Sequence, residues 1–159
     1  MSGPPSQVPD WLLSIPRLVW APVRWIARRF RRYAVDRQSL VREGSTVVTP
    51  VSQLVQALGP ESIVWGTDEQ NKDLLAQRYE KWEELRGPLM TYGNHHPSDR
   101  VKEQAAEVEQ AVMLDLNRTV LLLATRRTAT TMDAFEESKR AHADALEKTD
   151  RLIEEIRSY

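Results

Sequence analysis

Apolar and small side chains recur every three or four residues over the last third of the chain. From Phe135 onward the spacing alternates strictly between three and four, which is the heptad pattern of a helix with one packed seam. The seam consists of Phe135, Ser138, His142, Ala145, Thr149, Leu152 and Ile156. Its small and partly polar centre is typical of a bundle helix, and such a seam packs inside the chain's own bundle or recruits a second copy or a partner helix.

Residues 98–124 carry a wider apolar surface at the same spacing, so we expect the most buried helix there. The stretch that follows, residues 126–131, has the sequence RRTATT and contains neither glycine nor proline. Threonines weaken a helix without breaking it. We expect a hairpin turn, because one helix of about 60 residues would leave a long seam unpaired in a monomer. A single long helix is the alternative.

Residues 67–94 have the signals of a further helix. Thr67 and Gln70 have the spacing of a capping box, which predicts the first turn. Gly87-Pro88 is expected to break or kink this helix, and Gly93-Asn94 to end it. The pattern over 67–159 therefore predicts an all-α body, a three-helix antiparallel bundle or hairpin.

Residues 43–66 predict a small mixed connector between this body and the N-terminal part. Ser45–Thr49 and Ser62–Trp65 are rich in β-branched side chains and are predicted as short strands. A short helix is predicted between them, from Pro50 to the stop at Gly59-Pro60. Residues 36–44 are interpreted as a polar joint. Lone strands that add to the edge of a partner's sheet are the alternative to a packed connector.

Residues 11–42 form a basic arm after a disordered lead over residues 1–10. On a helical wheel, arginines gather on one face and apolar side chains on the other, with Arg29 as the exception and a bend expected at Pro22. Such a helix suits an anionic membrane surface, where arginine meets phosphate and tryptophan lies in the interfacial layer. The candidate binding residues are Arg17, Trp20, Arg24, Trp25, Arg28, Arg29, Phe30, Arg31 and Arg32.

Charge is segregated along the chain. Residues 1–42 have a net charge of +6, whereas the remainder has a net charge of −7. Arg17 and Arg24 argue against a membrane span, because a central arginine costs about 2.5–3.5 kcal/mol on insertion scales. Nucleic acid is a less favoured partner, since the arm's apolar face has no use there and the acidic body would repel it. Packing of the arm on the body and a mitochondrial transit peptide are further alternatives.

The sequence offers no positive evidence of catalysis. It has no cysteine, and its three histidines lie at His95, His96 and His142 without the carboxylate spacing of a di-iron bundle. We therefore expect no cofactor, no metal and no small-molecule substrate. The hypothesis is a cytoplasmic, peripheral protein at the inner membrane face, an adaptor or scaffold whose arm binds anionic lipid and whose body binds a protein partner or itself. The alternative is a soluble subunit that docks through its arm into a protein or nucleoprotein assembly.

Overall fold

The computed structural model describes residues 36–64, 66–125 and 131–159. The chain divides into two compact units, Met1–Ser39 and Leu40–Tyr159, and the second unit is described here. A helix over residues 36–57 is followed by α2 (Glu61–Val64), α3 (Asp68–His95), α4 (Asp99–Thr125) and α5 (Thr131–Ser158). The part of the chain that the structure describes is thus all-α, and it contains no strand.

The helix over residues 36–57 includes the segments predicted as a polar joint and as the first strand. Ser45–Thr49 is helical, and Ser62–Val64 belongs to α2, so the prediction of strands there is wrong; Trp65 lies outside the described residues. β-branched residues favour strands, but this segment is helical because it buries one face. The members of this face recur at helical spacing and are Gly44, Val48, Val51, Val55 and Leu58. Packing of this face overrides the local strand preference.

Helix α3 begins as predicted and ends later than predicted. Thr67 Oγ1 accepts from the Gln70 amide at 3.2 Å, and Gln70 Oε1 accepts from the Thr67 amide at 3.1 Å, which confirms the capping box. A break or a kink is predicted at Gly87-Pro88; the helix continues through Pro88, so a break does not occur. It ends at His95, after which the His96 amide donates to the carbonyl of Tyr92.

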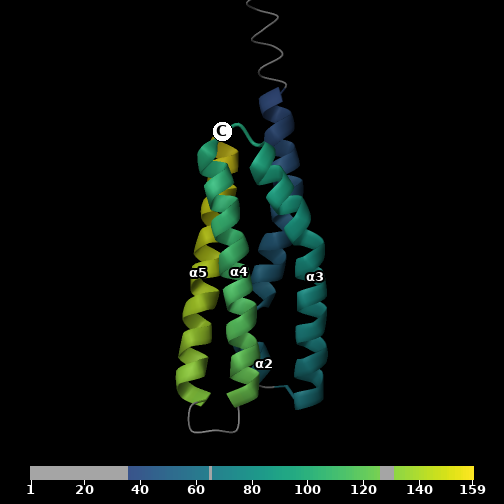
Figure 1. The fold of residues 1–159 in the computed structure, drawn as a ribbon, viewed down its shortest axis with the longest axis vertical. Coiled ribbons are helices and arrows are strands. Elements are labelled where there is room, and N and C mark those ends of the chain that lie inside the picture. The colour runs from purple at the N-terminus through teal and green to yellow at the C-terminus, as the bar shows by residue number, and fades with distance from the viewer. Residues whose placement is uncertain (1–35, 65, 126–130) are drawn as a thin grey trace, which may run out of the picture. The chain divides into compact units, whose positions relative to one another are not determined.

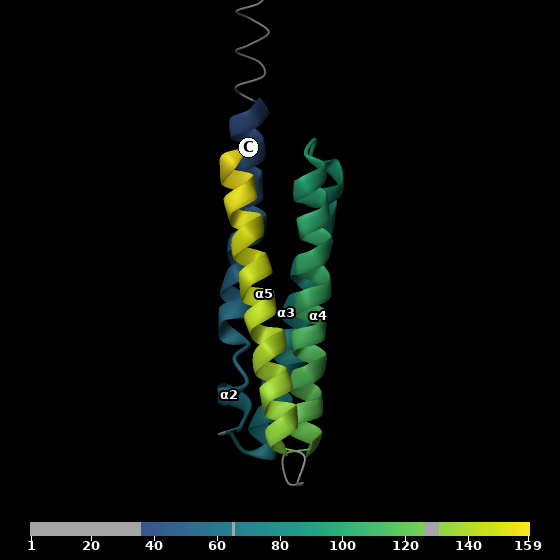
Figure 2. The same ribbon diagram turned by 90° about the vertical axis from the view of Figure 1, so that its left-hand side faces the viewer.

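Helices α4 and α5 form the predicted hairpin. Helix α4 ends at Thr125, α5 begins at Thr131, and the two lie side by side in opposite directions (Figure 2). A single long helix over this region is therefore excluded. Residues 126–130 lie outside the described residues.

One apolar core joins residues 40–57 with α3, α4 and α5, whose directions alternate along the chain (Figure 1). Trp82 of α3 is fully buried in it, together with Val51 from the first helix, Leu116 from α4 and Leu152 from α5. The predicted three-helix body is therefore incomplete, because residues 40–57 contribute a further long helix to the bundle. The core is built from all four of these helices.

Two glycines allow the helices to approach closely. A Cβ at Gly44 would lie 2.4 Å from the Tyr92 hydroxyl oxygen and 2.7 Å from Ile156 Cγ2. The Tyr92 hydroxyl in turn donates to the Leu40 carbonyl at 2.9 Å. A Cβ at Gly93 would lie 2.7 Å from the Ala105 Cβ, at the contact of α3 with α4. Both positions require glycine because a neighbouring side chain occupies the space.

Candidate functional site

The candidate lipid-binding residues of the arm lie outside the described residues. They are Arg17, Trp20, Arg24, Trp25, Arg28, Arg29, Phe30, Arg31 and Arg32. The structure therefore does not test whether these side chains lie close together. The chemistry that can be examined in three dimensions lies in residues 40–159.

The heptad seam of α5 faces the interior of the bundle. Ala145, Leu152 and Ile156 are buried in the common core. His142 and Phe135 are partly buried. The seam thus packs inside the chain's own bundle, and a partner helix could use it only by displacing another helix of this chain.

His142 meets a buried carboxylate from the neighbouring helix. Its Nδ1 lies 2.9 Å from Oδ2 of Asp115, which is fully buried on α4, and a carboxylate there accepts a hydrogen bond from the imidazole N–H. Burial raises the pKa of Asp115, while the hydrogen bond from His142 and the charge of Arg78 oppose that rise. The pair connects α4 to α5 through a polar contact within the seam.

Arg78 extends this polar layer to the remaining elements. Its guanidinium is buried, and Nη2 donates to the Ala57 carbonyl at 2.5 Å and to Ser62 Oγ at 2.8 Å. Burial lowers the pKa of Arg78, and the charge of Asp115 opposes this effect. Arg78 therefore links α3 to the end of the first helix and to α2, while Asp115 and His142 link α4 to α5. The charges of Arg78 and Asp115 attract each other between these two contacts, and the three residues are called the polar layer below.

The polar layer is a structural element more than a reactive one. Asp115 is 0% exposed and the His142 side chain 15% exposed, so a substrate has little access to either. The imidazole Nε2 lies 3.9 Å from where a Cβ on Gly59 would be, so the chain segment at Gly59 lies against the ring. Within the described ranges, no group of three or more histidine, aspartate or glutamate side chains could hold a metal ion. The layer instead supplies buried polar contacts between the elements that it joins.

Sequence reasoning missed Arg78 and Asp115 as partners. A signal was present at Asp115, a lone carboxylate inside the apolar run AVMLDL. Arg78 stands at an apolar-face position of its helix, where its aliphatic stem alone would satisfy the pattern. Their pairing depends on how α3 and α4 pack, which helical spacing does not specify.

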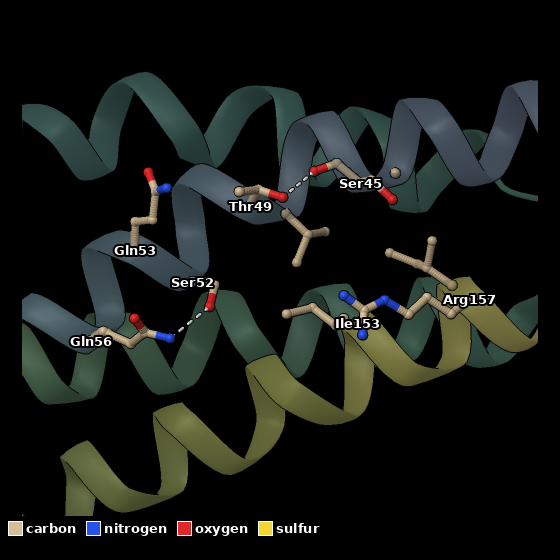
Figure 3. Close-up of a pocket in the computed structure, with 10 residues that line it drawn as sticks. Ser45, Thr49, Ser52, Gln53, Gln56, Ile153 and Arg157 are labelled. Atoms are coloured by element: carbon tan, nitrogen blue, oxygen red, sulfur yellow. Dashed lines mark hydrogen bonds between the residues drawn. The ribbon is translucent and has the colours of Figure 1, made fainter.

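A groove of about 270 Å³ lies between the helix over residues 36–57 and α5 (Figure 3). Its wall on the first helix is mostly polar, and its wall on α5 is apolar except for Arg157. The lining residues are Gly44, Ser45, Val48, Thr49, Ser52, Gln53, Gln56, Ile153, Ile156 and Arg157. None of the ten carries a carboxylate, although residues 43–159 have a net charge of −7.

Hydrogen bonds orient the hydroxyl groups of this groove. Ser45 Oγ donates to the Val41 carbonyl at 2.9 Å, and Thr49 Oγ1 donates to the Ser45 carbonyl at 2.6 Å. These two hydroxyl oxygens therefore offer only acceptor lone pairs to a ligand. Ser52 Oγ accepts from Gln56 Nε2 at 3.4 Å, which leaves the Ser52 hydroxyl proton available to donate.

The outer surface of the α4–α5 hairpin exposes several large apolar side chains. Leu114, Val120 and Leu121 on α4 are each more than two-fifths exposed, and Met132 at the start of α5 is 68% exposed. No helix in the described ranges is long and apolar enough to cross a membrane.

Comparison with known proteins finds no matching family model, no matching curated protein and no matching solved structure.

Proposed function

We propose that this protein is a non-catalytic, peripheral membrane adaptor that acts in the cytoplasm at the inner face of a membrane. The observation that carries the proposal is the segregation of charge, with +6 in residues 1–42 and −7 in the remainder. An anionic leaflet attracts each nearby basic side chain by about 1 kcal/mol and repels the acidic body. In this account the arm binds lipid and the bundle stays in the aqueous phase.

The attachment of the arm to the bundle supports this division of roles. The predicted arm extends to residue 42, and residues 40–42 belong to a helix that continues into the buried core at Val48 and Val51. The Tyr92 hydroxyl bonds to the Leu40 carbonyl and fastens the start of this unit to α3. The last residues of the predicted arm, 40–42, are therefore part of the folded body.

The adaptor part of the proposal concerns the outer surface of the bundle. Because the α5 seam is occupied by the chain's own core, a protein partner has to bind elsewhere than at Ala145, Leu152 and Ile156. A bound partner would leave the heptad seam packed against the chain's own helices. Substitutions on the seam would then weaken folding and partner binding together, whereas surface substitutions would affect binding alone.

Vesicle flotation of the full chain tests the lipid-binding role. The double variant Ile26→Asp, Phe30→Asp places two charges on the arm's apolar face and keeps every arginine. We expect the unaltered chain to float with vesicles containing phosphatidylglycerol and the variant to stay in solution, because apolar burial supplies part of the binding energy. A matched control is Leu114→Asp, Leu121→Asp, which adds the same charge to exposed positions of the body.

Two outcomes contradict the proposal. Equal flotation of the arm variant and the unaltered chain would show that the arm's apolar face does not meet lipid. Absence of flotation for the unaltered chain, together with recovery from its host in a stoichiometric complex that resists detergent, would favour the soluble-subunit alternative.

A further inference from the structure

The groove between the helix over residues 36–57 and α5 has the chemistry of an anion site in an acidic body. Arg157 contributes the one positive charge of its lining, and its side chain extends along α5 toward Ile153 (Figure 3). Arg157 forms no ion pair with another described residue. An arginine in a groove without a carboxylate is suited to a phosphate, whose oxygens match the planar guanidinium fork.

Neutral donors stand on the opposite wall. The free Ser52 hydroxyl proton and the side-chain amides of Gln53 and Gln56 come from the first helix, across the groove from α5. Neutral donors together with one guanidinium can bind a phosphate without an excess of charge. This wall therefore complements Arg157.

The remaining polar atoms specify what the phosphate is attached to. Ser45 Oγ and Thr49 Oγ1 donate to their own helix, so each presents lone pairs only. Lone pairs repel phosphate oxygens and accept from hydroxyl groups. Val48 and Ile156 add an apolar patch against which carbon atoms can pack. The arrangement thus suits hydroxyl-bearing carbon next to a phosphate.

We infer that this groove binds a phosphorylated polyol, with the phosphate on Arg157, Ser52 and the two glutamines and the polyol hydroxyls on Ser45 and Thr49. Glycerol phosphate has this chemistry. It can be a small free molecule or part of the headgroup of an anionic lipid. The inference rests on residues 44–157 and is independent of the arm. It extends the proposed function only if the source is lipid.

Amide shifts of the full chain in solution test the site, with sn-glycerol 3-phosphate as the probe and glycerol as the uncharged comparison. We expect saturable shifts at Ser52, Gln53 and Ile153 with the phosphate and weaker ones with glycerol. Arg157→Gln should weaken binding by roughly tenfold, because it removes a charge-assisted hydrogen bond. Arg151→Gln is the control, with the same change of charge on the same helix at a position outside the groove.

A second variant tests the hydroxyl acceptor of Thr49 without changing the charge of the groove. Thr49→Val keeps the shape of the side chain and removes the hydroxyl acceptor, so it should weaken binding of glycerol phosphate while leaving that of inorganic phosphate unchanged. The inference is overturned if no shift saturates, if Arg157→Gln and Arg151→Gln bind equally, or if Thr49→Val weakens both probes alike.

Vesicles distinguish the two sources of the ligand. With phosphatidylglycerol vesicles, a lipid headgroup in the groove predicts that Arg157→Gln reduces flotation more than Arg151→Gln does. If the two variants float equally but Arg157→Gln still weakens binding of free glycerol phosphate, the ligand of the site is the free molecule. The variant Ile26→Asp, Phe30→Asp should keep the glycerol phosphate shifts even where flotation is lost, so failure of the arm and failure of the groove are separable.

Discussion

Asp115 and Arg78 are buried ionisable side chains, and for each of them the cost of burial opposes the attraction between their charges. Removing the Asp115 carboxylate from water costs more free energy than its interactions with His142 and Arg78 recover. The pKa of Asp115 therefore lies above its ordinary value of 3.8. The folded state therefore favours the protonated carboxyl more than the unfolded state does. This difference has a measurable consequence for the pH dependence of stability.

The free energy of unfolding should depend on pH through Asp115. Because the folded-state pKa is raised, the stabilising contribution is present in full below the unfolded pKa of 3.8 and is lost as pH rises through the folded value. Relative to Asp115→Asn, which does not titrate, the unaltered protein should lose stability as pH rises above about 4. Urea unfolding of both proteins across this range measures the difference. A difference that grows in favour of the unaltered protein with rising pH would contradict the account.

Arg78→Met should destabilise the bundle strongly. The substitution keeps the aliphatic volume, but it removes the hydrogen bonds to Ala57 and Ser62 and leaves Asp115 without its cation. We expect a loss of about 3 kcal/mol in the free energy of unfolding. Arg151→Met is the control, because the side chains of Arg151 and its partner Glu147 are both more than half exposed, and surface ion pairs contribute about 0–1 kcal/mol. Equal losses for the two variants would refute a special role for the polar layer.

At the scale of elements, sequence patterns predicted the parts whose signals are local. The capping box at Thr67 and the helical spacing within α4 and α5 depend on neighbours a few residues away, and both were predicted correctly. Residues 45–49 are predicted as a strand because β-branched residues dominate the local signal, and Pro50 is interpreted as the start of a separate helix. Their helical conformation depends on burial against α3 and α5, which is a tertiary effect.

The candidate sites were less predictable than the helices. His142 was identified on the seam, but its partner Asp115 lies 27 residues away and on another helix. The groove depends on the packing of residues 44–56 against α5, and no short motif encodes that contact. Side chains that belong to one site here come from segments about a hundred residues apart, so periodicity within each segment could not reveal the site.

Gly44→Ala tests the packing of the first helix directly. Alanine favours an isolated helix by about 1 kcal/mol over glycine. A Cβ at this position would nevertheless meet Tyr92 and Ile156 at distances well below van der Waals contact. We therefore expect net destabilisation of about 1–3 kcal/mol, as for overpacking in a core.

Gly87→Ala is the matched control for this substitution. A Cβ at Gly87 would meet no atom within 4 Å, although Gly87 precedes Pro88, whose ring disfavours helical conformation at the preceding residue. Stability should change by less than about 1 kcal/mol, measured by thermal or urea unfolding. Stabilisation by Gly44→Ala would show that the first helix does not pack against α3 and α5 as described.

At the scale of the whole molecule, the chain joins a basic N-terminal segment to an acidic bundle that has its own apolar core. Attraction between the arm and an anionic leaflet is electrostatic in part, and it should weaken as salt shortens the Debye length to about 8 Å at physiological ionic strength. Burial of the arm's apolar face is less sensitive to salt. Binding should therefore decline with salt without disappearing.

Tryptophan fluorescence on titration with vesicles is the decisive measurement of lipid binding by the arm. Three of the five tryptophans, Trp11, Trp20 and Trp25, lie in the arm, Trp82 is already fully buried in the bundle, and the arm variant separates their signal from that of Trp65. We predict a saturable blue shift with phosphatidylglycerol vesicles, a much smaller shift with neutral phosphatidylcholine vesicles, and loss of the shift in Ile26→Asp, Phe30→Asp. A shift of equal size with neutral and anionic vesicles, or no shift with either, would contradict the account.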